Sequence, residues 1–271
     1  MPRAYSTAKT VLAALIGLIM LAPFVYLAIG ALSESFSLTT TIDLSSWQFT
    51  LSNFGELLGR AELVRPLLNS LIVAVVVTIG SLVFCTLSGY VLARRRFRGR
   101  AALMSSVMLV LMIPVHIVII PLYLLTNWFG IFDTYLALIL PFLVNPLGIF
   151  LMRQYITALP VELEEAARLE GASELTIIWR VVMPLCRPAL AVLAVQVFLV
   201  NWNSFLYPFI LTSSESLRTL PVALALLAGY QDINVPQLFA ASLLSALPVT
   251  ILFVIYSRRI TEGIIAGALK G

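Results

Sequence analysis

The sequence predicts an all-α integral membrane protein with six transmembrane helices. The chain has 271 residues, of which 61% are hydrophobic and only 11% charged, and its mean hydropathy is +1.02. Soluble domains are roughly half apolar and about a quarter charged. Six long intervals contain no Asp, Glu, Lys or Arg: residues 10–33, 66–93, 101–132, 134–152, 188–214 and 233–257. A helix crosses a bilayer with about 20 apolar residues, so each interval can form one span.

The first interval is predicted to be a span rather than a signal peptide. Arg3 and Lys9 precede it, as basic residues precede a secretory signal. Its apolar core, from Val11 to Leu32, is longer than the roughly 7–15 residues of a signal core, and five more intervals follow. We therefore expect residues 1–66 to contain an N-terminal tail, the first span and an outer connection.

The other five intervals predict a membrane core over residues 67–258, with a cytoplasmic loop at 153–187 and a C-terminal tail at 259–271. Prolines recur inside these spans: Pro114, Pro121, Pro141, Pro146, Pro208 and Pro248. Proline bends a helix and releases backbone carbonyls. Two interpretations remain open, namely simple packing geometry and a bundle that flexes around a pathway.

The charge distribution predicts that both termini are cytoplasmic. With six spans the termini share one side, and placing them inside puts 14 of the 17 basic residues and 6 acidic residues on that side. The outer side then carries 3 basic and 7 acidic residues. Cytoplasmic loops are enriched in Lys and Arg, so the orientation N-in, C-in follows.

Several function classes are disfavoured. No Asp, Glu, Lys or Arg lies deep in a span, which argues against an ion-coupled secondary transporter. No cluster of His, Cys and carboxylates suggests a metal site, and no paired nucleophile and base suggests catalysis. The basic stretch 94–100 is short and abuts a span, so we interpret it as a topological anchor rather than a nucleic-acid surface.

Amides beside an aromatic ring occur within the spans, at Asn145, Asn201, Trp202 and Asn203. Ring faces pack on sugar C–H groups and amides bind hydroxyls, so these residues are candidates for lining the path of an uncharged hydroxylated solute. Hydrogen bonding between helices is the alternative explanation for each of them.

The loop between the fourth and fifth spans predicts two short helices. Pro160 suits the first position of a helix, acidic residues follow it, and Gly171 can adopt the left-handed conformation that ends it. Ser173 can cap a second helix that ends at Pro184. Ala166 and Ala167 give the first helix a low profile next to Glu165, so the surface of another protein can approach the backbone there.

Glu165, Ala166, Ala167, Gly171 and Pro184 together resemble the Glu-Ala-Ala loop of permease subunits in binding-protein-dependent ABC importers. Further segments look like the carbohydrate branch, and specifically its smaller, six-helix, maltose-type permease: Asn69-Ser70, Gly89-Tyr90, Ile120 to Tyr123, Trp202-Asn203 and Gly263 to Gly271. The resemblance covers roughly residues 11–271.

The resemblance implies the type I ABC importer permease fold and a coupling helix that docks on a cytoplasmic ATPase. The coupling residues would be Glu165, Ala166, Ala167, Glu170, Gly171 and Pro184, with Glu170 standing where the family often has Asp. The C-terminal residues Gly267, Lys270 and Gly271 would contact the interface between two ATPase subunits.

The resemblance also implies the partners and the location. These are a homologous second permease, a dimeric ATPase that binds ATP and magnesium, an extracytoplasmic solute-binding protein, the lipid bilayer and a sugar, in the cytoplasmic membrane of a bacterium or archaeon. The chain has no Gly-rich phosphate loop with its lysine, so we expect no enzymatic activity and no cofactor in this subunit.

The predicted function is therefore ATP-driven import of a sugar delivered by the binding protein. The alternatives are an importer of the same fold for a polyol, a sugar phosphate or another small solute and, from a different class, an ion-coupled secondary transporter. A phosphorylated solute would require basic residues facing the cavity, and the spans contain none.

Overall fold

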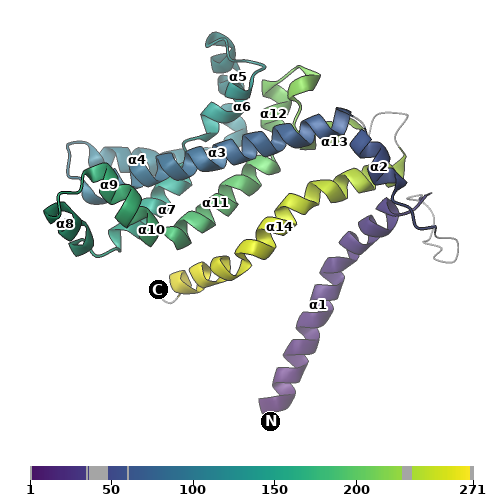
Figure 1. Cartoon of the computed structure of the whole chain (residues 1–271), viewed down its shortest axis with the longest axis horizontal. Helices are drawn as coiled ribbons and strands as arrows, with labels where there is room; N and C mark the ends of the chain where they lie inside the picture. The colour runs from purple at the N-terminus through teal and green to yellow at the C-terminus, as the bar shows by residue number, and fades with distance from the viewer. Residues whose placement is uncertain (1, 35, 37–47, 60, 228–233, 269–271) are drawn as a thin grey trace. The chain divides into compact units, whose positions relative to one another are not determined.

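A computed structural model describes residues 2–34, 36, 48–59, 61–227 and 234–268 (Figure 1). Within these ranges the chain is helical, and its only extended pairing is an isolated antiparallel bridge between Ser33 and Phe49. The all-α prediction is therefore confirmed.

In the described part of the chain, four helical stretches are long and apolar enough to cross a membrane: Lys9–Ala31, Leu63–Arg94, Tyr135–Thr157 and Val235–Tyr256. They belong to the following elements: α1 (Pro2–Ala31), α3 (Ala61–Arg94), α6 with η2 and α7 (Tyr135–Ile139, Leu140–Phe142 and Pro146–Thr157), and α14 (Val235–Ala268).

Among the described residues there are also two bent helix pairs, and the number of candidate spans is six if each pair forms one span. In the first pair, α4 (Arg100–Leu111) meets η1 (Val115–Val118) and α5 (Ile119–Trp128) at 98°. Pro114 lies at this break, where its missing N–H interrupts the helical ladder as the sequence predicted. In the second pair, the segment Glu174–Leu185 meets α11 (Arg187–Trp202) at 83°.

The remaining described helices are short. They are α2 (Ser52–Gly59), α8 (Glu162–Leu169), α9 (Glu174–Ile177), the π-helix η3 (Ile178–Val182), α10 (Met183–Leu185), α12 (Leu206–Leu211), η4 (Glu215–Leu217) and α13 (Leu220–Leu227).

The chain forms two compact units, of which the first contains Met1–Arg65 and Ala223–Pro248. In this unit the amide nitrogen of Asn53 donates to the carbonyl oxygens of Ala31 and Ser33, both at 2.9 Å. Asn53 is buried, so these bonds satisfy its donors and tie α2 to the end of α1. The predicted outer connection includes residues 37–47, which lie outside the described part of the chain.

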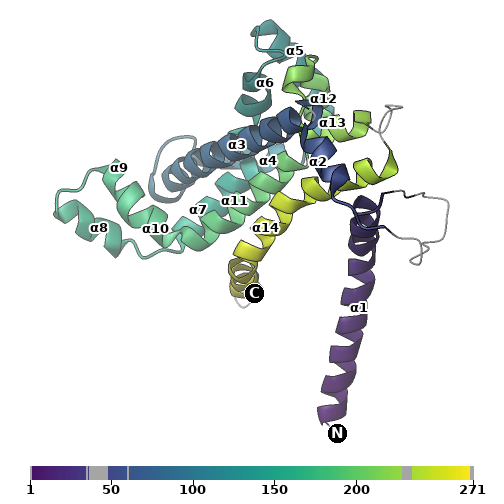
Figure 2. The same ribbon diagram turned by 45° about the vertical axis from the view of Figure 1, so that its right-hand side comes forward.

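The second unit contains Pro66–Val222 and Val249–Gly271, and its central helices α3, α4, α7 and α11 lie side by side (Figures 1 and 2). Its core includes Cys85 from α3, Met152 from α7 and Leu193 from α11. Gly89 allows α3 to approach α7 closely, because a Cβ there would lie 2.8 Å from the Cβ of Met152 and 2.9 Å from the backbone nitrogen of Arg153.

The N-terminal part of α3 is fixed to the loop before α13 by a buried amide. Asn69 Nδ2 donates to the carbonyl oxygens of Ser216 and Arg218, both at 2.9 Å, and its Oδ1 accepts from the Tyr135 hydroxyl at 2.6 Å. The other end of α3 contacts α8 through Arg94 and α9 through Tyr90 (Figure 1). One long helix therefore joins the two ends of this unit.

We predict that Gly89→Ala destabilises the protein by about 1–3 kcal/mol, because the added methyl group meets α7 backbone that cannot rotate away. The midpoint of thermal unfolding in detergent measures the effect. Gly17→Ala is the matched control, since a Cβ at Gly17 in α1 has nothing within 4 Å. Equal midpoints for the two variants would contradict the close approach of α3 and α7.

Candidate functional site

The segment between α7 and α11 folds into an elbow, which comprises α8, α9, η3 and α10. Helix α8 begins at Glu162, two residues after Pro160, and the carbonyl of Val161 accepts the amide hydrogens of Glu164 and Glu165. Three acidic residues in its first turn face the positive end of the helix dipole. Gly171 ends it with φ of +84°, the left-handed conformation that the sequence predicted.

The second half of the elbow differs from the prediction at Pro184. Ser173 caps α9 as expected, its Oγ accepting the amide hydrogen of Thr176 at 3.3 Å. The helix does not end at Pro184, however, but continues to Leu185, and the 83° turn comes at Cys186. Proline has no N–H for the carbonyl four residues earlier, and the wider π-helical turn of η3 precedes it, so the helix passes Pro184 without a break.

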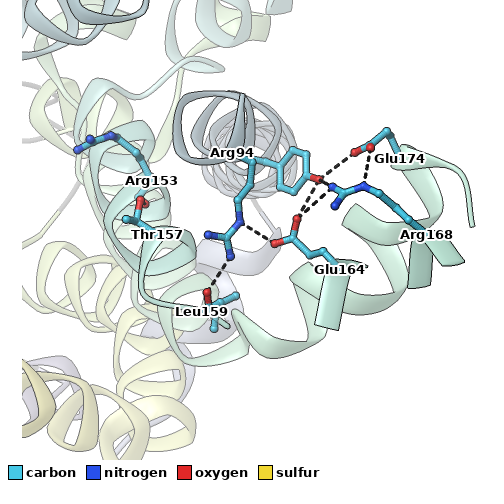
Figure 3. Close-up of polar contacts among 8 residues, drawn as sticks. Arg94, Arg153, Thr157, Leu159, Glu164, Arg168 and Glu174 are labelled. Carbon is cyan, nitrogen blue, oxygen red and sulfur yellow. Dashed lines mark hydrogen bonds and ion pairs between the residues drawn. The ribbon is translucent and has the colours of Figure 1, made fainter. Parts of the chain in front are cut away.

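A buried carboxylate fixes the elbow to α3. Glu164 is only 1% exposed. Its Oε1 accepts from Arg94 Nε at 2.7 Å, and its Oε2 lies 3.1 Å from the Tyr90 hydroxyl and 3.5 Å from Arg168 Nη2 (Figure 3). Arg94 Nη2 also donates to the carbonyl of Leu159 at 2.9 Å. The charge of Glu164 is thus paired and hydrogen-bonded, as a buried charge requires.

A second carboxylate joins the two halves of the elbow. Glu174 Oε1 accepts from Arg168 Nε at 3.0 Å and from Arg95 Nη2 at 2.6 Å, while Oε2 lies 2.9 Å from the Tyr90 hydroxyl. The hydrogen bond from Arg168 is the main cause that lowers the pKa of Glu174 to about 2. Glu174 is therefore ionised at neutral pH. We call Tyr90, Arg94, Glu164, Arg168 and Glu174 the Glu164 cluster.

Helix α8 carries two different faces. Glu164 points inward, whereas Glu165 and Ala166 are exposed and Ala167 is partly buried. Leu169, near the end of the helix, is 90% exposed. The outer face of α8 therefore exposes a carboxylate, a small side chain and an apolar side chain. Its inner face is fixed to α3 through Glu164.

The coupling residues predicted from the resemblance occupy both halves of the elbow. Five of them lie on or directly after α8: Glu165, Ala166, Ala167, Glu170 and Gly171. Pro184 is exposed and lies in α10. Sequence reasoning missed Glu164, whose only local signal was Arg168 one turn later on the same helix.

The candidate path residues make contacts with their own helices. Asn145 caps α7, its Oδ1 accepting the amide hydrogen of Gly148 at 2.9 Å. Asn201 Nδ2 donates to the carbonyl of Val197 at 2.8 Å, and Asn203 Nδ2 to that of Leu199 at 2.9 Å. Trp202 is buried and its ring stacks with that of Phe198, at a centroid distance of 5.7 Å.

These candidates lie at the ends of α7 and α11 that are remote from the elbow, because the elbow connects the last residue of α7 to the first of α11. Their role in a path stays a prediction. Of the C-terminal candidates, Gly267 falls in the helical backbone of α14, and Lys270 and Gly271 lie outside the described residues.

Residues 85–262 match the family model described as "Binding-protein-dependent transport system inner membrane component". The chain belongs to this family. The match begins in the last part of α3, includes the whole elbow and extends through most of α14, so the resemblance drawn from the Glu-Ala-Ala loop is confirmed. The permease is a membrane transport subunit, in agreement with the spans described above.

Curated relatives cover nearly the whole permease. The arabinooligosaccharides transport system permease protein AraQ of Bacillus subtilis is 31% identical over 98% of this chain and 96% of its own length. The trehalose/maltose transport system permease protein MalG of Thermococcus litoralis is also 31% identical, over 96% of this chain and 95% of its own length.

Among solved structures, a chain of a bacterial ABC transporter involved in the import of the acidic polysaccharide alginate superposes with a TM-score of 0.85. The two are 24% identical, and the match covers 94% of this chain and 96% of the other. The permease therefore has the ABC importer permease fold that the sequence predicted.

We predict that Arg94→Ala loosens the elbow, because it leaves the buried Glu164 carboxylate without its shortest ion pair. Removal of one partner of a buried pair costs about 3 kcal/mol or more. Amide hydrogen exchange of α8 in the detergent-solubilised protein measures the effect, with Arg96→Ala as control, since Arg96 is exposed in the same basic stretch.

The double variant Arg94→Met with Glu164→Met tests the cause. Apolar side chains of similar length remove the uncompensated charge, so exchange should be slower than in Arg94→Ala alone. Equally fast exchange in the double variant would show that the pairing of charges is not what holds α8.

Proposed function

We propose that this permease is one transmembrane subunit of an ATP-driven ABC importer that translocates a sugar delivered by an extracytoplasmic binding protein. The observation that carries the proposal is the elbow, in which exposed Glu165 and Ala166 lie on a helix fixed to α3 through buried Glu164. The sugar transport named for the arabinooligosaccharide and trehalose/maltose permeases supports a sugar as the solute.

Helix α8 is the proposed coupling helix. Its exposed carboxylate at Glu165 is offered to a basic residue of a cytoplasmic ATPase subunit, and the small side chain of Ala166 permits close approach. ATP and magnesium are bound by that subunit, in which hydrolysis takes place. This assignment places the elbow, and with it both chain termini, on the cytoplasmic side, in agreement with the bias of basic residues.

Movement of the coupling helix is proposed to pass into the membrane through the Glu164 cluster. Arg94 and Tyr90 belong to the last two turns of α3, so a displacement of α8 pulls on that helix directly. The spans are proposed to change their angle at the breaks near Pro114 and Cys186, where the helix pairs are bent by 98° and 83°. Rocking of such segments alternately opens a central cavity outward and inward.

The central cavity is proposed to lie between this chain and a homologous second permease. Asn145, Asn201, Trp202 and Asn203 are the proposed contacts for sugar hydroxyls and ring faces. A binding protein would dock on the outer connections at 33–66 and 213–236. A second solved structure supports such docking, because it is a bacterial alginate ABC transporter in complex with an alginate pentasaccharide-bound periplasmic protein. The matching chain has a TM-score of 0.66 and 18% identity.

We predict that Glu165→Lys abolishes ATP-dependent uptake while the protein level in the membrane stays normal. The substitution reverses the charge offered to the ATPase and leaves the Glu164 cluster intact. Uptake of labelled sugar and co-purification of the ATPase are the measurements. Glu162→Lys, in the same exposed helical turn, is the control and should retain uptake. Normal uptake by Glu165→Lys would remove the coupling-helix assignment.

The C-terminal residues Gly267, Lys270 and Gly271 are proposed to contact the interface between the two ATPase subunits. We predict that Lys270→Glu lowers the ATPase rate stimulated by the binding protein without preventing assembly. Lys9→Glu is the control at the other terminus. An unchanged rate in Lys270→Glu would show that the tail is passive.

A further inference from the structure

An open groove of about 680 Å³ runs along α4 where this helix packs against α7. Arg100, Met104, Met108 and Met112 line it at intervals of four residues, so they form one stripe along the helix. Arg153 from α7 lies at the same groove. Its walls are therefore apolar, and its two charged side chains are both arginines.

The two guanidinium groups have no carboxylate partner in the described part of the chain. Among the ion pairs there, none includes Arg100 or Arg153. Figure 3 shows the Arg153 guanidinium extending away from the buried carboxylate of Glu164. Both side chains are partly buried, so water does not solvate them as fully as it solvates a surface arginine. The groove thus places two arginines that form no ion pair in the described part of the chain beside apolar walls.

The position of the charges along the groove indicates an elongated amphipathic ligand. Arg100 is the first residue of α4 and the last of the basic stretch 94–100, which marks the cytoplasmic edge of the membrane in the predicted orientation. From Arg100 to Met112 the helix rises about 18 Å, which exceeds half of a hydrocarbon core of about 30 Å. An anionic head at the arginines would thus be followed by a chain lying against methionine.

The geometry points to a binding site for one anionic phospholipid, with its phosphate between Arg100 and Arg153 and an acyl chain along Met104, Met108 and Met112. Methionine side chains adapt to a flexible chain, and guanidinium groups bind phosphate oxygens through charge-assisted hydrogen bonds. An apolar protein helix in the same place would cover the methionine side chains. It would leave both arginines without an anionic partner at the membrane edge.

Native mass spectrometry of the assembled, delipidated importer, titrated with phosphatidylglycerol or phosphatidylcholine, tests the proposal. We expect phosphatidylglycerol to bind more tightly, and Arg100→Gln with Arg153→Gln to weaken it about tenfold or more, as the loss of hydrogen bonds to charged groups predicts. Arg96→Gln with Arg98→Gln removes the same charge from exposed residues of the same stretch and should leave binding unchanged.

Two further measurements distinguish the occupants. Met108→Trp fills the groove without a change of charge and should also weaken phosphatidylglycerol binding, whereas inorganic phosphate at equal concentration should not compete. Displacement of the lipid by phosphate would mean a free-anion site and would overturn the proposal. Equal binding of phosphatidylglycerol and phosphatidylcholine would also overturn it. An equal loss of lipid binding in Arg100→Gln with Arg153→Gln and in Arg96→Gln with Arg98→Gln would overturn it as well. So would cross-linking of a photoreactive residue at position 108 to the second permease instead of to lipid.

Discussion

The buried ion pair between Glu164 and Arg94 is the contact on which the position of the elbow depends. The two residues are 70 positions apart in sequence, and their side-chain atoms approach to 2.7 Å. A carboxylate that is almost fully removed from water requires such partners, since desolvation of an unpaired charge is costly. The helix that carries the exposed Glu165 surface is consequently fixed at its inner face, while its outer face remains free to bind.

The same cluster connects local structure in the elbow to the membrane helices. Tyr90 and Arg94 lie one helical turn apart on α3 and both contact Glu164. The ion pair between Arg168 and Glu174 holds α8 and α9 together across the turn at Gly171. At the other end of the second unit, Asn69 donates two hydrogen bonds to the loop before α13 and accepts a third from Tyr135 at the start of α6. Because α3 is fixed at both ends and packed closely on α7 at Gly89, it is suited to transmit displacement along its axis.

The sequence predicted those features whose physical causes are local. Charge-free intervals predicted the candidate spans, and Pro114 predicted a break. The left-handed backbone of Gly171 and the capping side chain of Ser173 predicted where one elbow helix ends and the next begins. The end of the second elbow helix was placed one residue too early, at Pro184, because the sequence does not reveal the π-helical turn that precedes this proline. Glu164 was missed because its closest partners, Tyr90 and Arg94, come from a distant part of the chain, and one acidic residue among three does not reveal which of them is buried.

The exposed apolar side chain of Leu169 affects how the affinity for a protein that covers it depends on temperature. Burial of a leucine side chain contributes about 1.5–3 kcal/mol near room temperature. This contribution is largely entropic and carries a negative heat-capacity change, so it weakens on cooling, whereas the attraction between Glu165 and a basic partner does not depend on apolar hydration. A complex formed through α8 would accordingly lose affinity in the cold, and its association enthalpy would become more favourable as the temperature rises.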